Sequence, residues 1–265
     1  MLIDIGVNLS NSRFADDIES ILIRAQEAKV TKMILTGTSI KETETVIELC
    51  ERYQDQFPSM LYATAGIHPH EAKSFNGSAT ETLEGLAKHS CVVAIGETGL
   101  DFNRNLSPQN TQEKAFESQI ELAVNCKLPL FLHERDASKR QLEILRSYQN
   151  HLPKAVIHCF TGDKKTLFSY LDLDLHIGIT GWICDERRGR DLQNIVKNIP
   201  LNRLMVETDA PYLLPRNMPE IPKNRRNEPA NLNYVIAGIT AHREESANII
   251  AESSSAAAVA FFNLT

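Results

Sequence analysis

The sequence CVVAIGETGLDF, residues Cys91–Phe102, contains the feature that decides the fold, an apolar run that ends at a carboxylate. Its first five residues are mostly apolar, which is typical of a strand buried on both faces of a parallel sheet. We expect this strand to end at Gly96, so that Glu97 follows in a glycine-flanked turn. A charged group at such a position is costly unless another group pairs with it. The stretch therefore predicts a site that Glu97 shares with other polar groups.

The same order of apolar strand and amphipathic helix repeats along the whole chain. The predicted strands are Leu2–Val7, Lys32–Thr36, Leu61–Ala65, Cys91–Ile95, Pro129–Leu132, Ala155–Ile157, Leu175–Ile179 and Leu204–Val206. Eight such units in 265 residues favour one (β/α)8 TIM barrel, with a doubly wound open sheet as the alternative. We expect a single domain over residues 1–265, with an additional C-terminal helix at about residues 244–262.

Composition excludes several classes of protein. The net charge of −6 is unlike that of a generic nucleic-acid coat protein, so a polyanion would have to be bound locally or through a metal. The apolar runs are far shorter than the ~20 residues of a membrane span, and the N-terminus enters a strand without the pattern of a signal peptide. The five cysteines are scattered without a CxxC pair, which predicts a reducing, cytoplasmic location.

Four ionisable side chains close four of the predicted strands. They are Glu97, His133, His158 and Asp209. In a (β/α)8 barrel the chemistry collects at the carboxyl ends of the strands, so we expect these groups to meet. Two imidazoles and two carboxylates suit a divalent metal with open positions, and Asp209 could also act as a general base toward water. The alternative is that each is an ordinary surface residue at a strand end.

Further polar residues lie in the loops that follow the strands. His68 belongs to an HPH sequence after the third strand, and we favour a place for it near the site. Two basic clusters predict phosphate contacts, with local ion pairs as the equally favoured alternative. They consist of Arg187, Arg188 and Arg190, and of Arg216, Lys223, Arg225 and Arg226 in or beside a loop with five prolines. No GxGxxG sequence occurs, so a nucleotide cofactor is not expected.

Seven motifs occur in order along the chain: GIHPHEA, AIGETGLDFNRN, FLHERDA, VIHCFTG, ITGWICDERRG, VETDAPYLLPR and RRNEPA. Together they resemble the TatD family of metal-dependent deoxyribonucleases, over nearly the whole length from Asp4 to Ala230. The resemblance implies a barrel of the amidohydrolase type that hydrolyses phosphodiester bonds, trimming single-stranded DNA or RNA from 3′ to 5′ in repair or turnover. It places Glu97, His133, His158 and Asp209 at metal and catalytic positions, and His68 and Arg216 close to the substrate.

One departure from this family concerns the first strand. Much of the wider family has Asp-x-His-x-His there, whereas this chain has Asp4, Gly6 and Asn8 at the matching positions. An asparagine carbonyl is a weak replacement for a carboxylate or two imidazoles, so we expect one tightly held metal and a second that is weak or arrives with substrate. Glu134 stands where the family has Cys, which adds a carboxylate near the predicted site.

Three functions remain open on the sequence. We favour a monomeric exonuclease that acts on single-stranded DNA or RNA ends with Mg²⁺, or with Mn²⁺ or Zn²⁺ in its place. A metal-dependent hydrolase of a small-molecule amide or lactone is the second hypothesis, because the predicted ligands alone permit it. A metal-binding protein without turnover is the third, and only the missing histidines of the first strand favour it.

Overall fold

The computed structural model describes residues 1–265 and contains eight β-strands in one sheet. The strands are β1 Leu2–Val7, β2 Val30–Leu35, β3 Leu61–Ala65, β4 Val92–Asp101, β5 Leu130–Arg135, β6 Ala155–Ile157, β7 His176–Ile179 and β8 Leu204–Val206. They follow one another in the sheet in the order of the sequence, and the strand pairs are parallel. Beyond β8, Ala210 bridges Val7 of β1 in parallel. This sequential order and return to β1 confirm the predicted (β/α)8 fold rather than the open sheet.

Helices alternate with the strands along the chain. They are α1 Ile18–Glu27, α2 Ile40–Tyr53, α3 Gly77–Leu86, α4 Gln109–Cys126, α5 Ser138–Ser147, α6 Lys164–Leu171, α7 Arg190–Ile195, α8 Leu232–Thr240 and α9 Ala247–Phe262. None of them combines the length and the apolar composition that a membrane crossing requires. The contacts group the chain into two units, and each is described by itself below. The first unit comprises Met1–Leu35, Cys159–Leu167 and Ile177–Thr265, and the second comprises Thr36–His158 and Phe168–His176.

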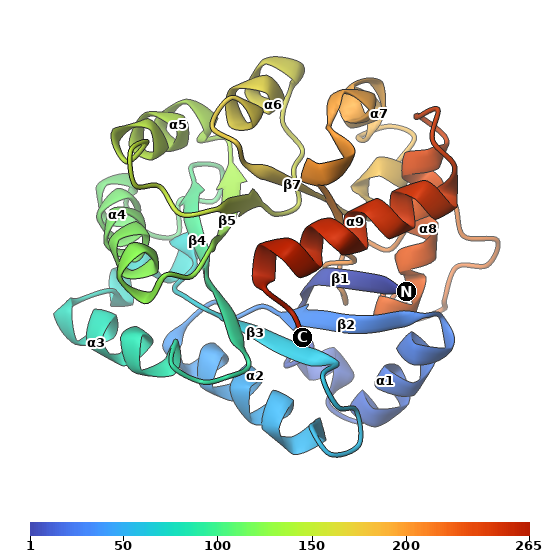
Figure 1. Ribbon diagram of the computed structural model, residues 1–265, viewed down its shortest axis with the longest axis horizontal. Helices are drawn as coiled ribbons and strands as arrows, with labels where there is room; N and C mark the ends of the chain where they lie inside the picture. The colour runs from blue at the N-terminus through green and yellow to red at the C-terminus, as the bar shows by residue number, and fades with distance from the viewer. The chain divides into compact units, whose positions relative to one another are not determined.

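In the second unit, α2, α3 and α4 lie outside strands β3 and β4 (Figure 1). The helix α2 begins after Ser39, whose hydroxyl accepts the N–H of Glu42, and it buries the apolar side chains of Val46 and Ile47. The strands β3 and β4 are buried along their whole length, as expected for parallel strands that are covered by helices. Apolar burial therefore holds the carboxyl ends of these strands in place.

Strands β4 and β5 both continue past the ends that the sequence predicts. The strand β4 was expected to stop at Gly96 but runs on to Asp101, and β5 continues through His133 to Arg135. The predicted end of β4 was wrong because its glycines belong to an irregular strand rather than to a turn, and β5 continues alongside it. The pairing of β4 with β5 shifts register between Ile95 and Thr98, and it then continues from Gly99 opposite His133.

Glycine is required at the irregular part of β4. Gly96 and Gly99 have φ angles of 147° and 134°, a region that side chains disfavour. A Cβ atom at either position would collide with a carbonyl oxygen of β5, that of Phe131 or that of His133. The two glycines thus let β4 approach β5 closely while it carries Glu97 and Asp101 to the end of the sheet.

Three buried glutamines fasten the ends of β3 and β4 to the surrounding helices. Gln119 of α4 accepts the N–H of Ile67 at 2.8 Å and donates to its carbonyl at 3.0 Å. Gln112 of α4 forms the same pair of bonds with the backbone of Asp101, at 2.9 and 3.1 Å. Gln141 of α5 accepts the N–H of Leu100 at 3.0 Å. Each amide replaces bonds that a regular sheet would have supplied to this backbone.

In the first unit, α9 lies across β1, close to the N-terminus (Figure 1). The hydroxyl of Ser255 on α9 donates to the carbonyl of Met1 at 3.1 Å, and Ser246 caps the start of the helix. Its buried side chains include Ile250 and Phe261. The helix therefore covers apolar side chains at one end of β1 and β8.

Candidate metal centre

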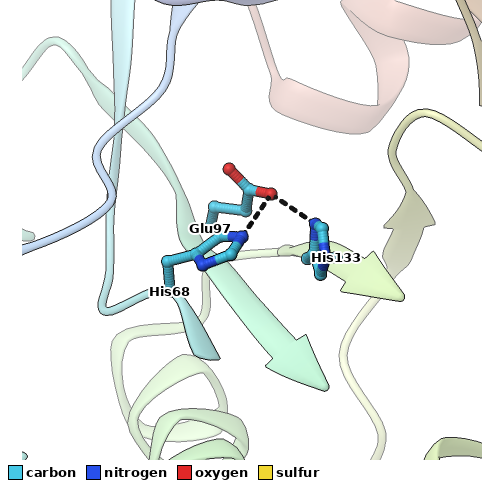
Figure 2. A group of neighbouring side chains, drawn as sticks. All are labelled: His68, Glu97 and His133. Carbon is cyan, nitrogen blue, oxygen red and sulfur yellow. Dashed lines mark hydrogen bonds and ion pairs between the residues drawn. The ribbon is translucent and has the colours of Figure 1, made fainter. Parts of the chain in front are cut away.

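Glu97 of β4 is the residue on which three imidazoles converge. Its Oε1 atom lies 2.9 Å from Nδ1 of His133, 3.1 Å from Nε2 of His158 and 3.3 Å from Nε2 of His68. Figure 2 shows the Glu97 carboxylate between His68 and His133, with both imidazoles directed toward it. The Glu97 side chain is buried, and burial alone would raise its pKa. The neighbouring histidines outweigh burial and hold the pKa of Glu97 well below its ordinary value.

His133 faces a carboxylate with each of its ring nitrogens. Nδ1 is the atom near Glu97, and Nε2 lies 3.5 Å from Oδ2 of Asp101. Burial lowers the pKa of the His133 ring, but Asp101 and Glu97 together raise it above its ordinary value. The ring is therefore held between two acceptors, one in the centre of the cluster and one at its side.

His68 is oriented by the backbone of its own loop. It precedes the 3₁₀ helix Pro69–Ser74, and the N–H of His70 donates to its Nδ1 atom at 3.1 Å. Because Nδ1 accepts this bond, the proton of the neutral ring is on Nε2, the atom that faces Glu97. Burial is the main reason why the pKa of His68 is lowered, which favours the neutral ring. His68 thus presents an N–H donor at the cluster.

His158 follows β6 and completes the group around Glu97. Its backbone N–H donates to the carbonyl of Leu132 at 2.9 Å, which extends the pairing of β5 with β6 by one residue. The ring stacks on Phe131, with 5.0 Å between the ring centroids. The structure therefore brings together three of the four predicted ligands, Glu97, His133 and His158, and adds His68.

The cluster suits a divalent cation. One oxygen or nitrogen atom from each of His68, Glu97 and His133 lies within 4.8 Å of the others. Imidazole nitrogens and a carboxylate oxygen that converge in this way are common ligands of divalent metals in hydrolases. Because the Nδ1 atom of His68 already accepts a hydrogen bond and its Nε2 atom carries the proton, the ligands that fit best are Glu97, His133 and His158.

Asp209, the fourth predicted ligand, lies in the first unit directly after β8. It adopts a left-handed backbone conformation with φ of 53°, and its N–H donates to the carbonyl of Gly6 at 2.9 Å. Its Oδ1 atom accepts a hydrogen bond from Nδ2 of Asn8 at 2.9 Å. Asn8 therefore contacts Asp209 as a donor through its amide nitrogen, whereas the sequence suggested a carbonyl ligand.

The position of Gly6 explains why β1 has no histidine there. The buried carboxylate of Glu207 lies next to Gly6, and a Cβ atom on Gly6 would be 2.5 Å from its Oε2 atom. Oε1 of Glu207 accepts the N–H of Cys159 at 2.5 Å, which fixes the carboxylate in this place. The space that a side chain at position 6 would need is thus occupied by Glu207, a residue that was not singled out from the sequence.

Asp4 of β1 binds Thr208, the second residue after β8, through both of its carboxylate oxygens. Its Oδ1 atom accepts the N–H of Thr208 at 2.9 Å, and its Oδ2 atom accepts the Thr208 hydroxyl at 2.5 Å. The side chain is fully buried, and this burial raises the pKa of Asp4 to about 8. Asp4 and Thr208 therefore hold the backbone that presents Asp209.

Asp101 is a further residue of the second unit that was not singled out from the sequence. Asp101 ends β4, and its Oδ2 atom lies 2.7 Å from Nε2 of His70. Asp101 would have been recognised as a residue at a strand end if β4 had been extended beyond Gly96. Glu134 was expected to add a carboxylate near the site. Its side chain accepts the N–H of Ala137, the residue before α5, at 2.8 Å.

The basic residues form local ion pairs in the first unit. Arg216, the predicted substrate residue, lies 2.9 Å from Glu186 and 3.4 Å from Asp185, and its side chain is 35% exposed. Arg188 pairs with Asp185 at 2.8 Å and packs over the ring of Trp182. Arg226 pairs with Asp17 and Glu228, both at 2.7 Å. Phosphate contacts by Arg216 stay a prediction, whereas Arg226 is tied to α1 and its loop.

Comparisons with known proteins agree with this geometry. The sequence pattern of the TatD related DNase family matches residues 3–263. A protein of Pectobacterium parmentieri called 3′-5′ ssDNA/RNA exonuclease TatD is 47% identical over 246 residues, 93% of each chain. The crystal structure of a TatD homologue from Escherichia coli superposes with a TM-score of 0.89 at 28% identity, and the match covers 100% of this chain and 98% of that one.

The wider fold class is visible in a more distant structure. An uncharacterised amidohydrolase from Saccharomyces cerevisiae has a TM-score of 0.87 at 24% identity, with coverage of 98% of this chain and 99% of that chain. This likeness concerns the fold alone and agrees with the expected barrel type. Since the family pattern spans almost every residue and the motifs around Glu97, His133 and His158 lie within it, the chain belongs to the TatD related DNase family.

Proposed function

We propose that this protein is a metal-dependent exonuclease that removes nucleotides from the 3′ ends of single-stranded DNA or RNA. The observation that carries the proposal is the convergence of His133 and His158 on one oxygen of Glu97, at 2.9 and 3.1 Å. The name of the relative from Pectobacterium parmentieri, 3′-5′ ssDNA/RNA exonuclease TatD, supports the choice of substrate and direction.

Glu97, His133 and His158 would hold a divalent cation, and we propose that Asp209 completes the set. A bound cation of this kind lowers the pKa of water and stabilises the negative charge that develops on a phosphate. We propose Mg²⁺, with Mn²⁺ or Zn²⁺ as alternatives that imidazole ligands also accept. A second cation would be weakly held, because Gly6 offers no side chain and Asn8 donates to Asp209.

Asp209, His68 and Arg216 would have separate roles in the hydrolysis. In the hydrolysis, a water oxygen would bond to phosphorus while its proton passes to the carboxylate of Asp209, and the bond from phosphorus to the 3′ oxygen would break. The departing 3′ oxygen would take up a proton from solvent and become the hydroxyl of the shortened strand. The Nε2–H group of His68 would donate to a phosphate oxygen, and the hydrogen bond from His70 to its other nitrogen supports this role. Arg216 would bind a phosphate further along the strand and give up its pairing with Glu186.

The test measures nucleotide release from a single strand labelled at one end. Protein treated with a chelator should lose activity and regain it with Mg²⁺, Mn²⁺ or Zn²⁺, and metal analysis of the untreated protein identifies the resident ion. Release should begin at the 3′ end and should stop with Asp209→Asn, while the control Asp191→Asn, an exposed residue of α7, retains it. Hydrolysis of lactones or cyclic amides without any cleavage of DNA or RNA would reject the proposal.

We also propose that residues 1–265 act as one domain, as a monomer in the cytoplasm, in DNA repair or nucleic-acid turnover. All five cysteines are free, as is usual in a reducing compartment. Sedimentation and cell fractionation would test the state of assembly and the location.

A further inference from the structure

Asp101 is held at every polar atom, although the proposed reaction gives it no part. Its backbone N–H and carbonyl are bound by Gln112, as described above. Its Oδ1 atom accepts the N–H groups of Asn103 at 3.0 Å and of Arg104 at 2.7 Å. The residue is 1% exposed. Such complete fixation leaves Oδ2 as the one carboxylate oxygen that can face other side chains.

The Oδ2 atom of Asp101 faces two histidines. It accepts a hydrogen bond from Nε2 of His70 at 2.7 Å, and it lies 3.5 Å from Nε2 of His133. That nitrogen of His133 is buried and forms no hydrogen bond in the structure. A buried ring nitrogen without a partner is costly, and the carboxylate of Asp101 is an acceptor 3.5 Å away from it.

We propose that Asp101 is a positioning residue that keeps the proton of His133 on Nε2 and so turns its Nδ1 atom toward Glu97. An imidazole that binds a metal through one nitrogen commonly donates from the other to a carboxylate, which fixes both the tautomer and the ring orientation. Here Nδ1 is the nitrogen 2.9 Å from Glu97, on the side where the cation would lie. The proposal rests on the metal site put forward under the proposed function.

His70 links this arrangement to His68. Its ring holds Oδ2 of Asp101, while its backbone N–H holds Nδ1 of His68. The ring of His68 contacts the rings of His70 and His133, with centroids 4.3 and 4.4 Å apart. One short segment thus sets the protonated nitrogen of His68 directly and that of His133 through Asp101. The Nε2 protons of His68 and His133 are thus fixed by His70 and Asp101, which are not themselves proposed metal ligands.

Asp101→Asn isolates the role of Oδ2. The asparagine oxygen can still accept from Asn103 and Arg104, so the turn is retained, while Oδ2 becomes an N–H donor that faces the histidines. The matched control is Asp136→Asn, which removes an exposed carboxylate after β5 that accepts only from the side chain of Asn103 at 2.6 Å. A second variant, His70→Asn, leaves Asp101 intact and removes its other partner.

Zn²⁺ is the probe, and two quantities are measured without reference to nuclease activity. Calorimetry should show that Asp101→Asn binds Zn²⁺ about 10–100-fold more weakly than the wild type, while Asp136→Asn binds it as before. Long-range ¹H–¹⁵N spectra of the Zn²⁺-loaded wild type should show the His133 proton on Nε2, and Asp101→Asn should lose this signature. His70→Asn should keep the proton on Nε2 and weaken Zn²⁺ binding less than Asp101→Asn does.

Several outcomes would overturn the proposal. They are a wild-type His133 protonated on Nδ1, an Asp101→Asn protein with unchanged affinity and unchanged spectrum, and an equal loss in Asp136→Asn. If Asp101→Asn failed to fold, the wild-type spectrum and His70→Asn would decide the question. A protein that showed the expected spectra and affinities but cleaved no nucleic acid would contradict the proposed function and leave Asp101 in its role.

Discussion

The backbone N–H of His70 donates a hydrogen bond to Nδ1 of His68, with 3.1 Å between the two nitrogens. This single contact decides what His68 can do, because a ring that accepts at Nδ1 carries its proton on Nε2. Nε2 of His68 lies 3.3 Å from Oε1 of Glu97, nearly as close as Nε2 of His158 at 3.1 Å. It nevertheless presents an N–H donor there rather than the lone pair that a metal ligand needs. Proximity to a carboxylate therefore does not by itself identify a metal ligand.

We predict that His68→Ala separates catalysis from metal binding. Loss of one donor to the developing charge should lower kcat by about 10²–10³-fold, whereas the affinity for Mn²⁺ should change little. Nuclease kinetics and Mn²⁺ calorimetry measure the two effects. His89→Ala, an exposed histidine before β4, should affect neither. If His68→Ala abolished Mn²⁺ binding, His68 would have to be counted among the ligands.

Glu97→Gln should weaken metal binding more than any other substitution in the second unit. The carboxylate oxygen on which three imidazoles converge is replaced by a neutral amide, so the loss should exceed the roughly 10–100-fold typical of a residue outside the ligand set. Calorimetry with Mn²⁺ checks this expectation. The control is Glu134→Gln, because the Glu134 carboxylate accepts the backbone N–H of Ala137 before α5. This substitution should lower the affinity for Mn²⁺ by no more than about 10-fold. Equal losses in the two variants would contradict the role of Glu97.

Arg216→Ala should weaken the binding of single-stranded DNA in a way that depends on salt. A residue that contacts one phosphate contributes about 0.7 to the slope of log K against log salt for a single strand, so the slope should fall by about this amount. Titrations at several salt concentrations measure it. Lys197→Ala removes an equal charge before β8 and should leave the slope unchanged. An unchanged slope in Arg216→Ala would mean that the ion pair with Glu186 persists on the nucleic acid.

Gly6→Ala should destabilise the protein. The added methyl would lie 2.5 Å from the buried carboxylate of Glu207, and the resulting overpacking should cost about 1–3 kcal/mol in free energy of unfolding. Denaturant titration gives this value. Gly85→Ala is a useful comparison, since a Cβ there meets nothing within 4 Å and its helix should gain about 0.5–1 kcal/mol. Equal stability of Gly6→Ala and wild type would show that Glu207 can move aside.

Asp4 should make stability depend on pH in an unusual direction. Its pKa is raised to about 8 in the folded protein, above the value of about 3.9 in an unfolded chain, so the folded state retains a proton that the unfolded state has lost. The stability it contributes is therefore complete below about pH 4 and declines by up to about 1.4 kcal/mol per pH unit until about pH 8. Asp4→Asn should remove this decline between pH 5 and pH 8.

The measurement for Asp4 is the free energy of unfolding of chelator-treated protein at several pH values. Between pH 5 and pH 8, the free energy of unfolding of the wild type should fall steadily relative to that of Asp4→Asn. Relative to that of Asp191→Asn, it should stay constant. A constant difference for Asp4→Asn would show that Asp4 is ionised when folded.

The barrel and the core of its site could be predicted from the sequence because both depend on local patterns. Apolar runs marked the eight strands, and parallel strands bring their carboxyl ends to one edge, so Glu97, His133 and His158 could be grouped before their distances were known. The resemblance to one family added the reaction and the substrate.

The remaining features depend on contacts that no local pattern contains. Asp101 was missed because glycines at positions 96 and 99 resemble a turn, although they permit a bulged strand to continue. Glu207 was missed because its neighbour is Gly6, 201 positions away in the sequence. Asn8 was assigned a carbonyl contact because the orientation of its amide depends on Asp209, which only the closed sheet brings near it.

The buried glutamines on α4 and α5 have a consequence for how the protein tolerates change. Each ties a helix of the outer layer to the backbone of a strand end through its side-chain amide, so a displacement of that helix is transmitted to the residues that carry His68, Glu97 and Asp101. Substitutions on the outward faces of these helices should accordingly leave the metal site unchanged. Substitutions that tilt a helix axis should instead displace the side chains of the site, although they lie far from it.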